Sequence, residues 1–380
     1  MDSITQILAR ELERKPEHVE NVIRLIDEGC TIPFIARYRK ELHGAMDDTA
    51  LRTLADRLQY LRNLEKRREE VRGAIEGQGK LTEELSAAIG RAATLAEVED
   101  LYRPYKQKRR TRATAAREKG LEPLAALLLA QGKDCPDPLT EAARYVDPEK
   151  GAASAEDALA GASDIVAEDI SDDADLRKTL RELYWKRGTL ASRAAEKEPE
   201  DTVYRLYYDF QTPVCKAQGH QVLAINRGER EGVLKVSVEL DEETALVAVR
   251  RAVIVPGSPA MAFVRGAAED AYRRLLAPSL EREIRSLLTE QADEGAIRMF
   301  GLNLKPLLMQ PPVKGKVTMG LDPGYRNGCK VAVVDGTGKV LDTAVVYPTF
   351  SEKKKREAMD TLKGLIRKHG VVHIAIGNGT

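Results

Sequence analysis

VTMGLDPGYRNGCKVAVVDGTGKVLDTAVVYP, residues 317–348, is the stretch that decides the fold of the C-terminal part of this chain. Its three apolar runs are rich in β-branched residues, which is typical of buried strands. Pro323-Gly324 forces a turn directly after the first run, and Asp335-Gly-Thr-Gly338 is a hairpin signal between the other two. One carboxylate, Asp322, ends the first run. An acid held at a strand end beside a glycine turn is a common way to present a carboxylate to a metal ion or a phosphate.

The elements that follow extend this pattern. Ser351 is placed to cap a basic amphipathic helix that ends at His369, and Val371–Ile376 reads as another buried strand. A strand with a terminal acid, then a hairpin, a helix and a strand, is how a ribonuclease H-like domain begins. Such enzymes hold two metal ions about 4 Å apart with several carboxylates. We expect the partner acid at the end of the last strand, where the chain has Gly377 and Asn378.

Because one carboxylate cannot hold a metal pair, we interpret Asp322 as a degenerate position, with Asn378 where the partner acid is expected. The sequence therefore predicts no catalytic residue, no metal site and no cofactor. Two alternatives stay open. Carboxylates beyond Thr380 would complete a metal-dependent nuclease or resolvase, since these strands do not bury a whole sheet and we expect the domain to be truncated. Residues 322–328, DPGYRNG, would otherwise form the phosphate loop of an actin-like nucleotide-binding domain.

Composition narrows the class of protein. Sixty Lys and Arg balance sixty Asp and Glu in 380 residues, so the net charge predicts no partner. The charges are segregated, however: residues 103–119 carry eight bases and one acid, whereas residues 152–176 carry eight acids and no base. Four widely spaced cysteines favour neither a zinc site nor a disulfide framework. No apolar run approaches the ~20 residues of a spanning helix and no signal peptide is visible, so we expect a cytoplasmic monomer without membrane contact.

Hydrophobic periodicity divides the chain into three parts. Residues 1–202 read as successive helices, among them a long one from about Asp48 to Gly77 in which leucines recur at three- and four-residue steps. Residues 203–312 are predicted to be a mixed α+β connecting segment, and residues 313–380 to begin a ribonuclease H-like domain.

Two features are expected inside the connecting segment. His220–Asn226 and Gly232–Val238 alternate with period two around Arg227–Glu231, which predicts a β-hairpin. Two helices are expected further on, separated by Pro278.

Two clusters of cations and aromatic residues are candidate nucleic-acid contacts. In the first, Tyr102 and Tyr105 are candidates for stacking on bases; in the second, Phe34 and Tyr38 lie among the cations. Alternatively, the first cluster pairs with the acids of residues 152–176, and the second is an ordinary packed helix with exposed arginines. The cations that would neutralise phosphates are Arg103, Lys106, Lys108, Arg109, Arg110 and Arg112 in the first cluster, and Arg37, Arg39 and Lys40 in the second.

Four motifs, in order along the chain, closely resemble the bacterial Tex family of transcription accessory proteins. They are TIPFIARYRKE (31–41), LYRPYK (101–106), LAINRGEREG (223–232) and MGLDPGYRNG (319–328). The resemblance implies a helical N-terminal region with a helix-turn-helix-like part, followed by a YqgF-type ribonuclease H-like domain without a working nuclease centre. In the family, a helix-hairpin-helix region and an S1 RNA-binding domain follow.

The expected fold class is therefore a mainly α N-terminal region with a helix-turn-helix-like part, a small α+β segment, and a partial α/β ribonuclease H-like domain. The expected function is that of a nucleic-acid-binding accessory factor in transcription and not of an enzyme. RNA, DNA or both are the expected ligands, and the transcription machinery is the further expected partner.

Overall fold

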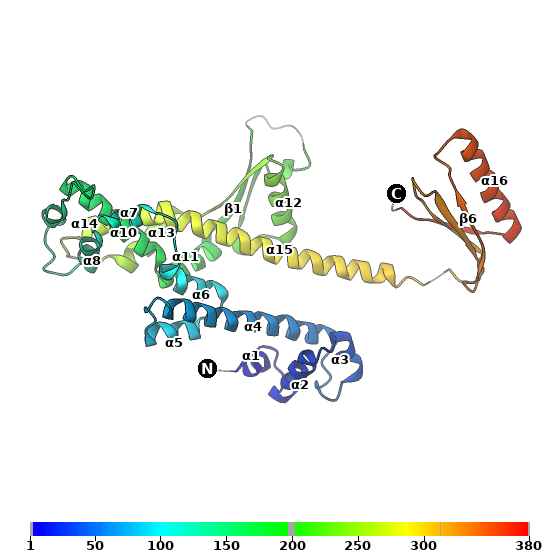
Figure 1. Cartoon of the computed structure of the whole chain (residues 1–380), viewed down its shortest axis with the longest axis horizontal. Helices are drawn as coiled ribbons and strands as arrows, with labels where there is room; N and C mark the ends of the chain where they lie inside the picture. Colours follow the sequence, from blue (N-terminus) through cyan, green and yellow to red (C-terminus); the bar gives the residue numbers. More distant parts are fainter. Residues whose placement is uncertain (1–2, 197–201, 312, 379–380) are drawn as a thin grey trace. The chain divides into compact units, whose positions relative to one another are not determined.

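The computed structural model describes residues 3–196, 202–311 and 313–378 of the chain (Figure 1). Two compact units are distinguished, Met1–Ala296 and Ile297–Thr380. The first is built of helices with one small sheet, and the second ends in a small α/β body. The predicted fold class, a mainly helical region followed by a small α/β domain, is confirmed.

The N-terminal layer consists of three short helices packed on a long one (Figure 1). Ser3 starts α1 with a capping box, Pro16 occupies the first turn of α2, and Asp47 caps α4 through the backbone N–H of Ala50 at 2.7 Å. The leucine stripe of α4 is buried as its spacing predicts, and it joins the core formed with α1, α2 and α3. The four helices are α1 (Ile4–Glu11), α2 (Pro16–Asp27), α3 (Ile32–Tyr38) and α4 (Asp48–Glu76).

The rest of the first unit is assembled around α10, which is contacted by α7, α8, α9, α11 and α14. Its small residues Ala158 and Ala162 are fully buried, because neighbouring helices approach closely there. The elements up to this core are α5 (Glu83–Arg91), α6 (Leu95–Tyr102), α7 (Arg112–Glu118), α8 (Glu122–Ala130), α9 (Pro138–Ala142), α10 (Ala155–Asp172) and α11 (Ala174–Arg187). Those after it are α12 (Gly219–Arg230), α13 (Glu242–Val253), α14 (Met261–Asp270) and α15 (Ala277–Leu308).

A three-stranded antiparallel sheet lies within this unit, in the order β2-β1-β3. Its strands are β1 (Thr189–Ala194), β2 (Asp209–Pro213) and β3 (Leu234–Glu239). The predicted hairpin at residues 220–238 is wrong: residues 220–226 lie in helix α12, and β3 pairs with β1. Val222 and Ile225 are buried three residues apart, on one side of the helix. In so short an apolar run, the sequence pattern of a buried helix cannot be distinguished from that of a strand. Gly228 is a close-packing position inside the helix and not a turn, since a Cβ there would lie 2.6 Å from Leu234 Cδ1.

The predicted break at Pro278 is also wrong. Helix α14 runs through a π-helical turn, Ala271–Leu276, directly into α15. Pro278 has no N–H to donate to the fourth preceding carbonyl, and the wider π turn just before it accommodates that missing hydrogen bond. The two predicted helices therefore form one continuous element.

The α/β body is a four-stranded sheet, in the order β6-β5-β4-β7, with α16 packed on one face (Figure 1). Neighbouring strands are antiparallel except for the parallel pair β4–β7. As predicted, Asp335 forms the hairpin turn, where its carboxylate accepts the backbone N–H groups of Thr337 and Lys339. The elements are β4 (Thr318–Asp322), β5 (Cys329–Val334), β6 (Val340–Val346), α16 (Glu352–His369) and β7 (His373–Ile376).

The two edge strands of this sheet, β6 and β7, have different surroundings. Asp342 on β6 accepts hydrogen bonds from Lys368 (2.8 Å) and His369 (3.0 Å) of α16, and these bonds lower the pKa of Asp342 to about 2. Strand β7 is exposed at all four positions, whereas the sequence predicts a buried strand. The difference arises because, among the described residues, β7 is an edge strand that pairs only with β4.

A buried ionic network joins α6, α11 and α15 inside the first unit. The Asp100 carboxylate, on a residue only 5% exposed, accepts Arg177 Nε at 2.7 Å and Arg181 Nη2 at 2.5 Å. Both arginines also contact Glu283. Because the charges of Asp100 and Arg177 are desolvated, each of the two depends on its partners in the network.

Asp100→Asn leaves the buried Arg177 short of negative charge, and we expect it to lower the free energy of unfolding by about 3–5 kcal/mol. The matched control is Glu182→Gln, which breaks the exposed pair Lys186–Glu182 and is expected to leave the free energy of unfolding nearly unchanged. Urea unfolding followed by circular dichroism measures both. Equal losses in the two variants would show that the buried network contributes nothing special.

Candidate nucleic-acid interface

The predicted cation and aromatic cluster on α3 is exposed and rests on a packed core. Ile35, on the inner side of α3, is fully buried against α1, α2 and α4. On the outer side, the rings of Phe34 and Tyr38 lie 5.2 Å apart between centroids, and 56% of Tyr38 is accessible. Packing of α3 on a core therefore presents these two rings to solvent in fixed positions.

Arginines lie over both rings of this cluster. The guanidinium of Arg39 is 5.2 Å from the centre of the Phe34 ring, and that of Arg37 is 6.0 Å from the centre of the Tyr38 ring. Within the described parts of the chain, Arg37, Arg39 and Lys40 form no ion pair. Their positive charge is thus available for an external anion.

The first predicted cluster lies differently, because part of it is neutralised by α10. Arg103 Nε is 3.1 Å from an Asp172 oxygen, and Lys108 pairs with Asp172 and, at 3.5 Å, with Glu168. Arg117 of α7 binds Glu168 at 2.6 Å and Asp169 at 2.7 Å. Arg103 and Lys108 therefore pair with the acids of residues 152–176, which is the alternative that the sequence left open.

Two acids of α10, Glu168 and Asp169, have pKa values shifted in opposite directions. Burial raises the pKa of Glu168, but the hydrogen bond from Arg117 and the charge of Lys108 outweigh it and keep that pKa below its usual value. Asp169 differs: although 43% of its side chain is accessible, desolvation by the surrounding protein raises its pKa to about 6, and the charges of Glu168 and Asp172 add to the shift. The raised pKa of Asp169 therefore reflects mainly its desolvation.

Three cations of the first cluster remain directed to solvent. Arg109 and Arg112 are exposed and form no ion pair within residues 3–196, 202–311 and 313–378. Arg110 pairs with Glu118 at 3.0 Å, but both side chains are more than half exposed, so this pair is weak. Lys106 pairs with Glu99.

The predicted stacking residues Tyr102 and Tyr105 are half-buried against the core of α4, α5 and α6. Arg67 and Lys106 lie 5.6 and 5.5 Å from the centre of the Tyr102 ring. Arginines also lie over Phe34 and Tyr38, but these two rings are more exposed than the half-buried Tyr102 and Tyr105, so they are the better placed for stacking on bases. No local pattern indicates the contact between Arg67 and Tyr102, because the two residues are remote from each other along the chain.

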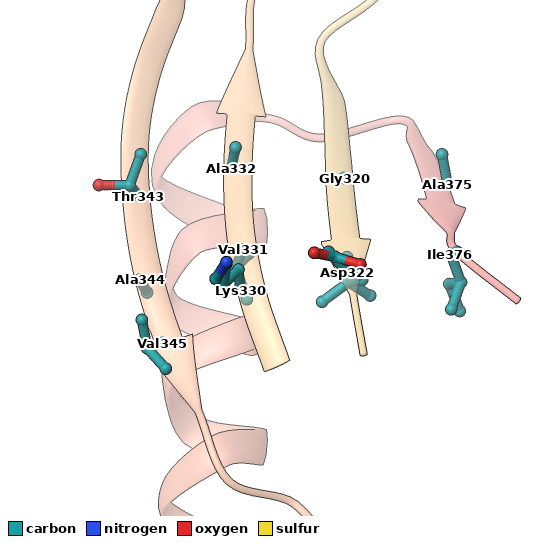
Figure 2. A pocket seen from close by; sticks show the side chains of 12 residues that line it. Gly320, Asp322, Lys330, Val331, Ala332, Thr343, Ala344, Val345, Ala375 and Ile376 are labelled. Carbon is teal, nitrogen blue, oxygen red and sulfur yellow. The ribbon is translucent and has the colours of Figure 1, made fainter. Parts of the chain in front are cut away.

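Asp322 lies at the end of β4, beside a shallow, mainly apolar groove on the sheet face opposite α16 (Figure 2). Its partner in the antiparallel register is Lys330. On its other side, Gly377 donates its N–H to Leu321 O at 2.8 Å, and a Cβ on Gly377 would lie 3.8 Å from Asp322 Oδ1. The residue next to Asp322 across β4 and β7 is therefore Gly377, and Asn378 follows one position later.

No other carboxylate of the α/β body joins Asp322 among the described residues. Asp335 is engaged in the hairpin turn, and Asp342 binds α16. Across residues 3–196, 202–311 and 313–378, no group of three His, Cys, Asp or Glu is arranged to hold a metal ion. Asp322 alone offers a single charge at the edge of an apolar groove.

The glycines of the loop after Asp322 have packing roles. A Cβ on Gly324 would lie 2.8 Å from the Gly328 carbonyl oxygen, so the loop closes on itself there. Gly328 has φ +78° and lies against Tyr347. These constraints explain the glycine pattern without a bound phosphate, the ligand that an actin-like interpretation requires.

The fold and this site define a class of protein with a helical N-terminal body followed by a YqgF-like α/β domain. Three family models match the chain: the Tex-like protein N-terminal domain at residues 2–76, the Tex central region-like model at 134–300 and the Tex protein YqgF-like domain at 316–380. The chain belongs to the Tex family.

Individual relatives agree with this assignment. The chain is 44% identical to "Protein tex" of Bordetella pertussis, over 98% of the chain and 49% of that protein. It is 42% identical to "Transcriptional accessory protein Tex" of Neisseria gonorrhoeae, over 100% of the chain and 50% of that protein. The human "S1 RNA-binding domain-containing protein 1" is 34% identical over 99% of the chain and 39% of its own length. The chain thus spans about half the length of the curated relatives it matches, or less.

No helix within the described residues is long and apolar enough to cross a membrane.

The unequal pairing of the first cluster predicts two separable phenotypes. Replacing Arg109, Arg110 and Arg112 by Ala should weaken binding of single-stranded RNA and lower the slope of log K against log salt by about 2, with an unchanged melting temperature. Replacing Arg103 and Lys108 by Ala should instead cost about 1–3 kcal/mol of stability, because Asp172 is then buried without partners. Fluorescence anisotropy and thermal unfolding measure the two effects. An unchanged salt slope in the first variant would assign those arginines to another role.

Proposed function

We propose that this chain is the nucleic-acid-binding, non-enzymatic part of a transcription accessory factor. The observation that carries the proposal is the α3 cluster, in which unpaired cations surround two exposed rings fixed on a rigid core. Cations neutralise phosphates, and aromatic faces stack on unpaired bases. The combination suits single-stranded nucleic acid, RNA or DNA.

The names of two relatives support the same function. One is called a transcriptional accessory protein, and another an S1 RNA-binding domain-containing protein. By analogy, we assign this chain a role beside the transcription machinery, as a cytoplasmic monomer. The proposal includes a helix-turn-helix-like contact of α2 and α3 with DNA. It also includes the division of the chain into three domains, at residues 1–202, 203–312 and 313–380.

The ribonuclease H-like body serves in this proposal as an inert platform. A two-metal centre needs acids on neighbouring strand ends, and the position across from Asp322 is occupied by a glycine, with an amide next. The competing function is a nuclease, and the exposure of Asp322 at a strand end is the observation that favours it.

The α3 cluster can be tested by separating charge from stacking. Replacing Arg37, Arg39 and Lys40 by Ala should lower affinity for single-stranded RNA and reduce the salt slope by about 2, since each phosphate contact contributes roughly 0.7. Tyr38→Ala should cost about 1–3 kcal/mol of binding with little change in slope. Anisotropy titrations at several salt concentrations distinguish the two. If neither variant binds more weakly than the unmodified chain, α3 is not the interface.

The inert platform is tested by a cleavage assay. We expect no cutting of single-stranded, duplex or branched nucleic acid with Mg²⁺ or Mn²⁺, and no difference between the chain and Asp322→Asn. The assay is repeated on the full-length protein of a relative with the equivalent substitution. Metal-dependent cutting that disappears with the substitution would overturn the inert interpretation and establish the nuclease.

A further inference from the structure

The α/β body is much more basic than the chain as a whole. Residues 313–380 carry twelve Lys and Arg against six Asp and Glu, although the complete sequence is neutral. Seven of these cations belong to a single helix, α16. A local excess of this size creates a positive potential around one helix of the body.

Some cations of α16 pair with carboxylates and others do not. Lys354, Lys355 and Lys368 contact carboxylates of Glu357, Glu352 and Asp342, respectively. The other four are exposed and form no ion pair within the described residues: Lys353, Arg356, Lys363 and Arg367.

The four unpaired cations form one stripe. At 100° per residue they lie within about 80° of helix circumference, and the stripe is opposite the side of α16 that buries Ala358 and Leu365 against the sheet. With a rise of 1.5 Å per residue, Lys353 and Arg367 are about 21 Å apart along the axis. One carboxylate, Asp360, shares the stripe.

The helix that carries the stripe is well defined at both ends. Ser351 caps its first turn by accepting the Lys354 N–H, and Gly370 ends it in the left-handed conformation with φ +63°. The stripe is therefore straight and fixed by packing, and does not depend on a mobile loop.

We infer that the outer stripe of α16 binds the phosphate backbone of duplex nucleic acid. A 21 Å row of cations spans about six base pairs, since each strand has one phosphate per 3.4 Å of axis. The inference rests on the proposed nucleic-acid function and adds a second contact of different chemistry. Unlike the α3 cluster, α16 carries no Phe, Tyr or Trp for stacking on unpaired bases. Its cations would contact backbone phosphates alone, and such contacts are independent of sequence.

Other partners fit the stripe less well. A membrane-surface helix inserts large apolar residues between its cations, whereas the apolar side of α16 is buried on the sheet. An acidic protein segment shares the charge but not the regular spacing of a duplex, and it is distinguished in the experiment below.

The test compares two double variants of the complete 380-residue chain that remove equal charge from one helix. Lys363→Gln with Arg367→Gln removes two stripe cations, and Lys354→Gln with Lys355→Gln removes two paired ones. Binding of a 20-base-pair DNA or RNA duplex is measured by anisotropy between 50 and 300 mM salt. We expect the stripe variant to lose about tenfold or more in affinity at 0.1 M salt and to lower the salt slope by about 2, with less than threefold loss in the control.

Two further variants make the outcome decisive. Lys363→Arg with Arg367→Lys keeps the charge and should keep the slope, which separates a lost contact from a disturbed helix. The α3 triple variant should keep duplex binding through α16 while losing single-strand binding.

Equal losses in the stripe and control variants would overturn the inference. So would competition by poly-glutamate at concentrations where unlabelled duplex fails to compete. If duplex binding ignores the stripe while the α3 variant loses single-strand affinity, the second contact is wrong and the proposed function stands. If the chain binds no nucleic acid at low salt, both fail.

Discussion

Carboxylates buried among the helices of the first unit must be neutralised by cations. This requirement determines which Lys and Arg side chains form internal ion pairs. Asp100 takes Arg177 and Arg181, while Glu168 and Asp172 take Arg103, Lys108 and Arg117. Removing any one partner would leave a charge desolvated. These cations are therefore structural, and the candidate binding surface is what remains after the internal pairs are made.

The same logic separates the two proposed contacts. On α3, cations and rings are presented together, which matches phosphates next to unstacked bases. On α16, four unpaired cations form a stripe without aromatic rings, which matches a phosphate backbone. Under the two proposals, single and double strands would be engaged by different side chains. Each surface is carried by a helix whose opposite side is packed.

Asp322 illustrates how strand register limits chemistry. A strand end and a glycine turn present the carboxylate, but the parallel register brings Gly377 beside it, and glycine contributes no ligand. The groove along the open sheet face is lined mainly by apolar and small residues. Among the described residues, Asp322 is therefore a single carboxylate at this strand end, whereas a two-metal centre needs several.

Elements with long or strongly marked patterns can be predicted from local sequence. The leucine stripe of α4, the Asp335 hairpin and the Ser351 cap all lie where local spacing and turn chemistry place them. The resemblance to the Tex family likewise rests on short sequence motifs, which can be compared without a structure. In each case the deciding interactions lie within a few residues of one another, so they are written in local sequence.

Contacts between distant segments, in contrast, depend on the tertiary structure. It made residues 220–226 a helix, because burial on one helical side outweighed a short alternating pattern. It divided the basic run of residues 103–112 into paired and free cations, because α10, about sixty residues away, brings its acids to one end of that run. It also placed Gly377 beside Asp322 through strand pairing. Long-range packing and register set these partners, and no local pattern records them.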